Sequence, residues 1–331
     1  MSRIVDRLRT SSDSVMEYKS YLLSEKGKKK IDAVVFGDSR IMSLNAQYVS
    51  EHVSNALGEK FELYNFSMPN HGVRAYYLLL QKYLRNHSAP QYILFSSAMI
   101  NLSGDWGVRT SVGRSEMLHR LCQLYSLKEL KEVLPFKTFL VALTVKAERM
   151  SFVVLYRALI KKLIFKVWKE IINNKSVNLK HYFIDTMSET ILSCARYNGG
   201  VIYVRNKKVT EEEIKHSKYY DSVLLIDEDM DYWYQKFFVL AREHGIKVLL
   251  VNAPVYRDIF QNNERNGNNQ TYRQVVNQWQ IKYDNVEVVG PLLQPYVLEN
   301  FSDWQHLNVI GTRQFTFSVT DYLIEYLKHR D

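Results

Sequence analysis

The sequence predicts an α/β fold in which a five-stranded parallel sheet lies between layers of helices. Five short apolar segments alternate with stretches whose apolar residues recur at helical spacing. Gly58 and Gly245 stand where two of the helices should end, and Gly37 breaks the first apolar segment. Strands that alternate with helices of this length pair in parallel and are covered on both faces.

The predicted strands are short. Most are mainly apolar, as expected for strands buried inside a sheet, whereas the second, Phe61–Phe66, alternates. The five strands are Ala33–Phe36, Phe61–Phe66, Tyr92–Ser96, Ile246–Val251 and Val286–Val289. Helices are expected between Ser39 and Leu57, at Gly72–Asn86, at Asp231–Gly245, near Tyr272–Lys282, and from near His306 to the C-terminus. The Asn-rich stretch Asn262–Asn269 is expected to be a mobile polar loop.

The alternation of strands and helices lapses between residues 101 and 230, which predicts a large, mainly helical insertion serving as a lid or docking subdomain. Its clearest helices are Met117–Val133 and Phe152–Ile172, and Gly199–Thr210 is a candidate hairpin. Residues 1–30 form a polar arm. Residues 31–100 and 231–331 together form the predicted α/β domain.

The composition limits the classes of protein to which the chain can belong. Apolar residues make up 46% of the 331 residues, which is ordinary for a globular chain. Two cysteines give no disulfide framework. We expect no signal peptide and no membrane span, and therefore a cytoplasmic protein, with a peripheral position at the inner membrane as the alternative.

A serine follows the first strand in the segment Gly37-Asp38-Ser39. A strand, a tight turn and a helix would present the hydroxyl of Ser39 at the carboxyl edge of the sheet, beside backbone N–H groups. An acyl-transfer enzyme needs a nucleophile presented in this way. Gly-Asp-Ser is also common in ordinary turns, where the serine only caps a helix.

A second motif stands before the last helix. Asp303 and His306 are three residues apart, so both side chains can lie on one side of a turn. The carboxylate could then fix the tautomer of the imidazole, and the imidazole could take a proton from a serine. The two motifs together are a more specific signal than either alone.

These residues resemble the motifs of the GDSL/SGNH hydrolases, over Ile31 to about Ser97 and about Ile246 to Leu327. The resemblance implies a flavodoxin-like three-layer sandwich with Ser39 as nucleophile, Asp303 as orienting acid and His306 as general base. The segment LLVNAPV and the altered third motif look more like a divergent branch, similar to polysaccharide O-acetylation and teichoic-acid D-alanylation proteins.

The resemblance also implies an oxyanion hole. Its backbone donors would be Ser39 and Asn70, which best matches the family's glycine. The family usually places a side-chain donor, an asparagine, after the third strand, where this chain has Met99, which cannot donate. Asn101 could replace it only in a reshaped loop. Turn formation before a helix is the alternative interpretation of the loop around Asn70.

Further residues near this edge are candidates for substrate binding. They are Asp38, Arg40, His71 and Gly72, which could meet an anionic or sugar substrate. Capping of the following helix is the favoured role of Asp38. Arg40 and His71 could equally be surface residues without a role.

The formal charge of +9 is concentrated in one region. Residues 136–180 contain ten Lys or Arg and two Glu. The helix Arg157–Ile172 has an apolar face opposite a basic one, the latter formed by Arg157, Lys161, Lys162, Lys166 and Lys169. It could pack on the α/β domain with its lysines in solvent, bind an anionic membrane surface, or bind a polyanionic glycan. We expect no nucleic-acid partner.

We expect neither a cofactor nor a metal, because the sequence has no dinucleotide, NTP or paired-histidine motif. The first functional hypothesis is a serine esterase or O-acyltransferase acting on an O-acylated carbohydrate or envelope lipid. The second is a catalytically degenerate SGNH module that binds or scaffolds a surface-polysaccharide assembly. A third is a peripheral membrane protein docked through the basic helix.

Overall fold

The computed structural model divides into two compact units, 1–20 with 107–192 and 21–106 with 193–331. It describes residues 18, 19, 22, 23, 30–69, 72–97, 99–102, 118, 121, 122, 124–150, 197–200, 210, 212 and 223–329. The second unit contains the sheet and both predicted motifs.

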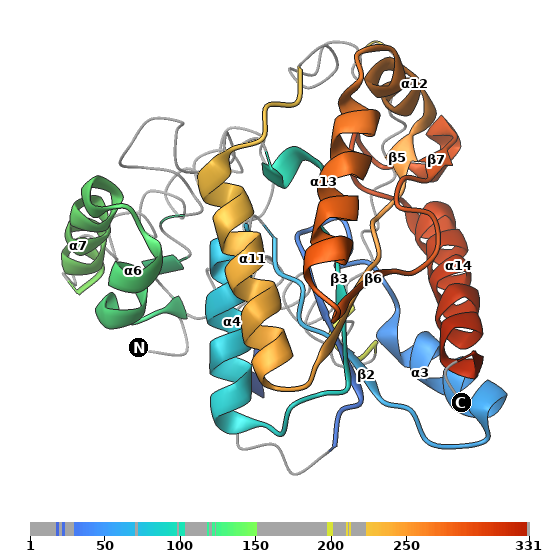
Figure 1. The fold of residues 1–331 in the computed structure, drawn as a ribbon, viewed down its shortest axis with the longest axis horizontal. Coiled ribbons are helices and arrows are strands. Elements are labelled where there is room, and N and C mark those ends of the chain that lie inside the picture. Colours follow the sequence, from blue (N-terminus) through green and yellow to red (C-terminus); the bar gives the residue numbers. More distant parts are fainter. Residues whose placement is uncertain are drawn as a thin grey trace, which may run out of the picture. The chain divides into compact units, whose positions relative to one another are not determined.

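A five-stranded parallel sheet forms the centre of the second unit, which confirms the predicted α/β fold (Figure 1). Its order is β2-β1-β3-β4-β6, and every neighbouring pair is parallel. The strands are β1 (Ala33–Phe36), β2 (Leu63–Asn65), β3 (Tyr92–Phe95), β4 (Lys247–Leu250) and β6 (Val286–Val288). Each lies within its predicted range. This order is that of flavodoxin-like three-layer folds.

Helices cover both faces of the sheet. On one face, α3 (Ala46–Leu57) packs against α14 (Val309–Lys328). On the other, α4 (Val73–Asn86) packs against α11 (Glu228–Glu243), and the two run side by side in Figure 1. A further helix, α13 (Asn268–Lys282), contacts the edge strand β6.

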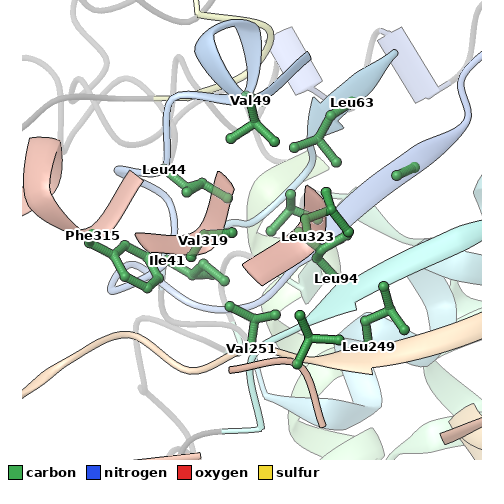
Figure 2. Packing of buried hydrophobic residues seen from close by; sticks show 14 of the residues in the cluster. Ile41, Leu44, Val49, Leu63, Leu94, Leu249, Val251, Phe315, Val319 and Leu323 are labelled. Carbon is green, nitrogen blue, oxygen red and sulfur yellow. The ribbon is translucent and has the colours of Figure 1, made fainter. Parts of the chain in front are cut away.

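The core beneath α3 and α14 is largely aliphatic (Figure 2). Alternate residues of the strands point to opposite faces, and Val35, Leu94 and Leu249 belong to this side. They meet Val49 of α3 and Val319 of α14, all at 0–1% exposure.

The opposite face is aromatic. Phe36 and Phe95, the last residues of β1 and β3, both contact Phe237 of α11, with ring centroids 6.2 and 4.5 Å apart. Tyr234 of α11 stacks on Trp279 of α13 at 4.8 Å. Edge-to-face and offset contacts of this kind add to the burial of the rings themselves.

The helix after Ser39 begins later than predicted. A turn occupies residues 39–43, and α3 begins at Ala46, capped by the Asn45 side chain, which accepts the N–H of Tyr48. The favoured role of Asp38 as a helix cap is therefore wrong. The predicted end is correct, since Gly58 closes the helix in the left-handed conformation at φ 71°.

The predicted Asn-rich loop is also wrong. Asn262 and Asn263 lie in α12 (Arg257–Arg265), and α13 begins at Asn268. The amides are buried and bond to one another or to backbone: Asn268 Nδ2 donates to Asn263 Oδ1 at 3.1 Å, and Asn269 Nδ2 donates to Phe260 O at 3.0 Å. Asparagines, which usually favour solvent-exposed loops, here link α12 to α13 through buried hydrogen bonds.

The structure also contains a small two-stranded parallel sheet that the sequence analysis does not predict. It pairs β5 (Val255–Tyr256) with β7 (Pro295–Tyr296) and is followed by the short 3-10 helix η2 (Leu298–Asn300). Another 3-10 helix, η1 (Met99–Leu102), follows β3. Strands of two residues carry too little periodic pattern to be predicted.

The described part of the first unit is helical. Its helices are α6 (Leu127–Val133) and α7 (Phe136–Met150). The predicted single helix Met117–Val133 is interrupted at Tyr125, because Ser126 and Glu129 form a capping box that starts α6. The predicted helix Phe152–Ile172 and residues 201–209 of the candidate hairpin lie outside the described residues. Among the helices that are described, none is both long enough and apolar enough to cross a bilayer.

We expect Gly37→Ala to destabilise the second unit. A Cβ at this position would collide with the methyl group of Ile41 and lie 2.9 Å from Cβ of Ser96, and both neighbours are buried. Overpacking of this kind costs about 1–3 kcal/mol. The thermal unfolding midpoint measures the effect. Gly72→Ala is the matched control, because nothing lies within 4 Å of its Cβ position and its φ is −107°. Equal midpoints for the two variants would contradict the prediction.

Candidate active site

The ends of three strands are tied together beside Ser39. The N–H of Phe66 donates to Val35 O at 2.9 Å, and the N–H of Met68 donates to Gly37 O at 3.0 Å. On the other side, Ser96 N donates to Phe36 O at 3.0 Å. The loops after β1, β2 and β3 therefore leave the sheet at one edge. Between β1 and β3 the order of the strands reverses, and this is where ligands bind in open α/β sheets.

Asn65, the last residue of β2, fixes the turn that follows Ser39. Its Nδ2 donates to Ile41 O at 3.1 Å and to Leu44 O at 3.2 Å. Its Oδ1 accepts the N–H of Ser67 at 2.9 Å. The side chain is fully buried. Removing it would take these hydrogen bonds away from buried backbone groups, so this amide defines the path of the chain between β1 and α3.

The segment that carries Asp303 and His306 is a closed loop. A bridge pairs Phe301 with Leu307, and Ser302 N donates to His306 O at 2.8 Å. Within the loop, Asp303 Oδ1 accepts the N–H of Gln305 at 3.0 Å and the N–H of His306 at 2.9 Å. The carboxylate is thus held by the backbone of the turn as well as by the ring of His306.

Asn308 joins this loop to α14. Its Oδ1 caps the helix by accepting the N–H of Ile310 at 2.9 Å and of Gly311 at 3.0 Å, while Nδ2 donates to Glu299 O at 2.6 Å. A side chain on Gly311 would collide with Asn300 O of η2. The first turn of α14 is therefore seated directly on η2, which leaves the loop with Asp303 and His306 little room to move.

The structure brings Ser39, Asp303 and His306 together. His306 Nε2 lies 2.7 Å from Ser39 Oγ, and His306 Nδ1 lies 2.8 Å from Asp303 Oδ2. With the proton on Nδ1 shared with the carboxylate, the lone pair of Nε2 faces the serine hydroxyl. The side chains of His306 and Asp303 are 16% and 26% exposed, so they are shielded from bulk water yet reachable from outside.

The loop keeps Asp303 ionised. Burial raises the pKa of its carboxyl group, but the hydrogen bond from His306, the charge of that ring and the N–H groups of Gln305 and His306 together lower the pKa below its ordinary value of 3.8. A carboxylate that stays charged can orient an imidazole and stabilise its protonated form.

A buried polar network lies behind the loop after β3. Tyr272 Oη lies 2.7 Å from Ser97 Oγ and accepts Asn252 Nδ2 at 2.7 Å. Asn252 Oδ1 accepts the N–H of Ser97 at 3.0 Å. Burial raises the pKa of Tyr272 to about 12, against the opposing effects of Ser97, Asn252 and Arg40. Tyr272 therefore stays a neutral hydroxyl, and the network joins the carboxyl ends of β3 and β4.

The structure describes only some of the other residues predicted to line the site. The backbone N–H of Ser39 donates to none of the described residues, so it is available as an oxyanion donor. Gly72 is the N-cap residue of α4. Asn70 and His71 lie outside the described residues, as does the side chain of Asn101, whose backbone belongs to η1.

Asp38 and Arg40 pair with each other. Arg40 Nε lies 3.0 Å from both carboxylate oxygens of Asp38, and the side chains are 15% and 10% exposed. Arg40 is therefore not the free surface residue of the alternative interpretation.

Among the described residues, no group of three or more His, Cys, Asp or Glu is arranged to hold a metal ion.

Sequence reasoning missed the amides and hydroxyls that support the site. Asn65 and Asn252 each stand at or just after the carboxyl end of an apolar strand. Such a residue is a signal, because a buried amide there must bond to neighbouring loops. The partner of Asn252, Tyr272, lies 20 residues away in a helix, and no sequence spacing indicates it.

The sequence matches one family over nearly its whole length. The model of a family described as "Protein of unknown function (DUF1574)" covers residues 10–320, a range that includes Ser39, Asp303 and His306. The chain belongs to this family. No curated protein matches the sequence. The DUF1574 description assigns no activity.

We expect Asp303→Asn to reduce stability in a pH-dependent way. The folded pKa of Asp303 lies below 3.8, so its stabilising contribution is full above that pH and is lost as the pH falls through the folded pKa. The wild type should exceed the variant in free energy of unfolding at pH 5, and the difference should shrink as the pH falls toward 3. Urea unfolding at several pH values measures it. A difference that widens toward pH 3 would contradict the lowered pKa.

Proposed function

We propose that the protein is a serine esterase or O-acyltransferase of the SGNH type that acts through an acyl-enzyme. The observation that carries the proposal is the pair of contacts made by His306, 2.7 Å to Ser39 Oγ and 2.8 Å to Asp303 Oδ2. A nucleophile bonded to a base, and a base bonded to an orienting acid, are the parts that acyl transfer needs. The GDSL/SGNH resemblance of the two motifs supports the same conclusion.

In the first half of the proposed reaction, His306 Nε2 takes the proton of Ser39 as Oγ attacks the ester carbonyl. The tetrahedral intermediate collapses, the alcohol leaves with the proton from Nε2, and Ser39 carries the acyl group. In the second half, His306 deprotonates water or a sugar hydroxyl, which attacks the acyl-enzyme. The acid or a new ester is released, and Ser39 regains its proton. Asp303 stays ionised throughout.

The oxyanion of each tetrahedral intermediate needs hydrogen-bond donors. The N–H of Ser39, which donates to none of the described residues, is the first, and we propose Asn70 and Asn101 as the others. One such donor is worth about 10²–10³ in rate. Because Met99 supplies no donor, the rate should depend strongly on the backbone groups.

The proposed substrate is an O-acylated carbohydrate or an envelope lipid. The similarity to polysaccharide O-acetylation and teichoic-acid D-alanylation proteins supports this class, and so does the basic stretch 136–180, which would attract an anionic glycan or membrane. The charged helix itself, Arg157–Ile172, belongs to the residues that are not described.

The alternative is a degenerate SGNH module that binds or scaffolds a surface-polysaccharide assembly without turnover. Met99 favours it, because a thioether stands where the resembled family has an amide donor. The two proposals differ in whether Ser39 is reactive.

Removal of the nucleophile should abolish activity. We expect Ser39→Ala to lower the rate of hydrolysis of a model acetyl ester by about 10⁴-fold or more, because the variant lacks the hydroxyl that bonds to His306 Nε2. Ser88→Ala is the control, since Ser88 is exposed and lies in the loop after α4. Hydrolysis that survives Ser39→Ala at the wild-type rate would refute the proposal.

Reactivity of Ser39 can be measured without knowing the substrate. We expect a fluorophosphonate probe to label the wild type at Ser39, and His306→Ala to lower the labelling rate by about 10³-fold or more, because the serine loses its base. Mass spectrometry of the labelled peptide identifies the site. A wild type that is folded but not labelled would favour the scaffolding alternative.

A further inference from the structure

Asp38 and Arg40 bond to each other across Ser39. The N–H of Arg40 donates to Asp38 Oδ1 at 2.9 Å, which closes a ring around the serine. The guanidinium returns to the same carboxylate, with Nε 3.0 Å from each oxygen and Nη2 also bonded to Oδ2. One side chain therefore receives backbone and side-chain donors from a single residue. We call this set of contacts the Asp38–Arg40 clamp.

The clamp is shielded from water. Asp38 is buried, and the side chain of Arg40 is 15% exposed. Burial by itself would lower the pKa of the Arg40 guanidinium. The charge and the hydrogen bond of Asp38, together with smaller contributions from Tyr76 and Tyr234, outweigh burial, so the pKa is raised. Tyr76, Tyr234 and Tyr272 also lie within electrostatic range of Arg40. A charge-assisted, bidentate pair in such surroundings is stronger and more rigid than the same pair in water.

The clamp distinguishes the two amides next to the nucleophile. The N–H of Arg40 is used by Asp38, whereas the N–H of Ser39 donates to none of the described residues. The Oγ of Ser39 meanwhile lies 2.7 Å from His306 Nε2. The same turn therefore presents a hydroxyl to the base and leaves one backbone donor over for a substrate.

We propose that Asp38 and Arg40 are positioning residues that hold Ser39 in the orientation needed for attack. This inference rests on the proposed function. Each acts through the turn: Asp38 holds the turn, and Arg40 holds Asp38. A displacement of about 1 Å at a nucleophile can cost about 10²-fold in rate, so a fixed turn is of direct use to the reaction.

The geometry of the clamp can be tested without any activity. We expect amide hydrogen exchange in residues 37–42 to accelerate by about tenfold in Asp38→Ala and Arg40→Met. The acceleration should be smaller in Asp38→Asn, because an amide oxygen can still accept the N–H of Arg40. Lys30→Met is the matched control: Lys30 Nζ lies 3.0 Å from Asp32 Oδ1, also two residues away, before the other end of β1. Unchanged exchange in both Asp38→Ala and Arg40→Met would overturn the clamp.

The positioning role is tested by kinetics per active site, counted by fluorophosphonate titration. We expect Arg40→Met and Asp38→Asn to lower kcat by about 10–100-fold with KM nearly unchanged, and Arg40→Lys to recover part of the loss, since it restores the charge without the planar fork. The pH profile of kcat should keep its shape, because His306 and Asp303 are intact. The double variant Asp38→Asn/Arg40→Gln, which buries no unpaired charge, should lose no more than the worse single variant.

The outcomes separate the two proposals. If clamp variants lose labelled sites while each remaining site turns over at the wild-type rate, the residues only stabilise the fold and the positioning role is wrong. If the wild type is not labelled at all, the proposed function fails and the positioning role fails with it, while hydrogen exchange still decides whether the clamp exists. Reduced kcat in both single variants, with exchange accelerated in 37–42, supports the inference.

Discussion

Burial of aliphatic side chains between α3, the sheet and α14 is the interaction on which the rest of the arrangement depends. Ile41 stands two residues after Ser39 and is fully buried in this cluster (Figure 2). Phe315 and Val319 of α14 belong to the same cluster, in the helix that begins just after His306. Each such side chain contributes about 1.5–3 kcal/mol. The packing that stabilises the domain therefore also brings the serine and the histidine together, and their hydrogen bond need add little stability of its own.

The sequence allowed most of the sheet and the three central side chains of the site to be predicted. Most residues of the five strands are apolar, as burial on both faces requires, although β2 ends in Asn65 and β6 contains Glu287. Ser39, Asp303 and His306 could be found because their order in the chain and their chemistry are uncommon in combination. The start of α3 and the Asn-rich stretch were mispredicted for different reasons. Asn45 is a local helix cap that sequence reasoning overlooked, since its side chain accepts the N–H of Tyr48 three residues later. Asn268 accepts the N–H of Leu224, 44 residues away, and local sequence preference does not include such a partner.

Support for the site comes mainly from neutral amides and from backbone. Asn65 holds the turn after Ser39, Asn252 joins the loop after β3 to Tyr272, and Asn308 joins the loop with His306 to α14. Amides can donate and accept at once, so a single side chain can connect two or three loops without burying a charge. The exception is the pair of Asp38 and Arg40, where two buried charges compensate each other.

The contact between His306 and Ser39 joins residues 267 positions apart in the chain. A polypeptide leaves the ribosome from its N-terminus, and segments near that end begin to fold first. The strand that precedes Ser39 can therefore pair with its neighbours long before the last helix has been made. Until that helix is made, the hydroxyl of Ser39 does not have the imidazole of His306 beside it. In a nascent chain, Ser39 would meet His306 only when the segment from Asp303 through α14 docks.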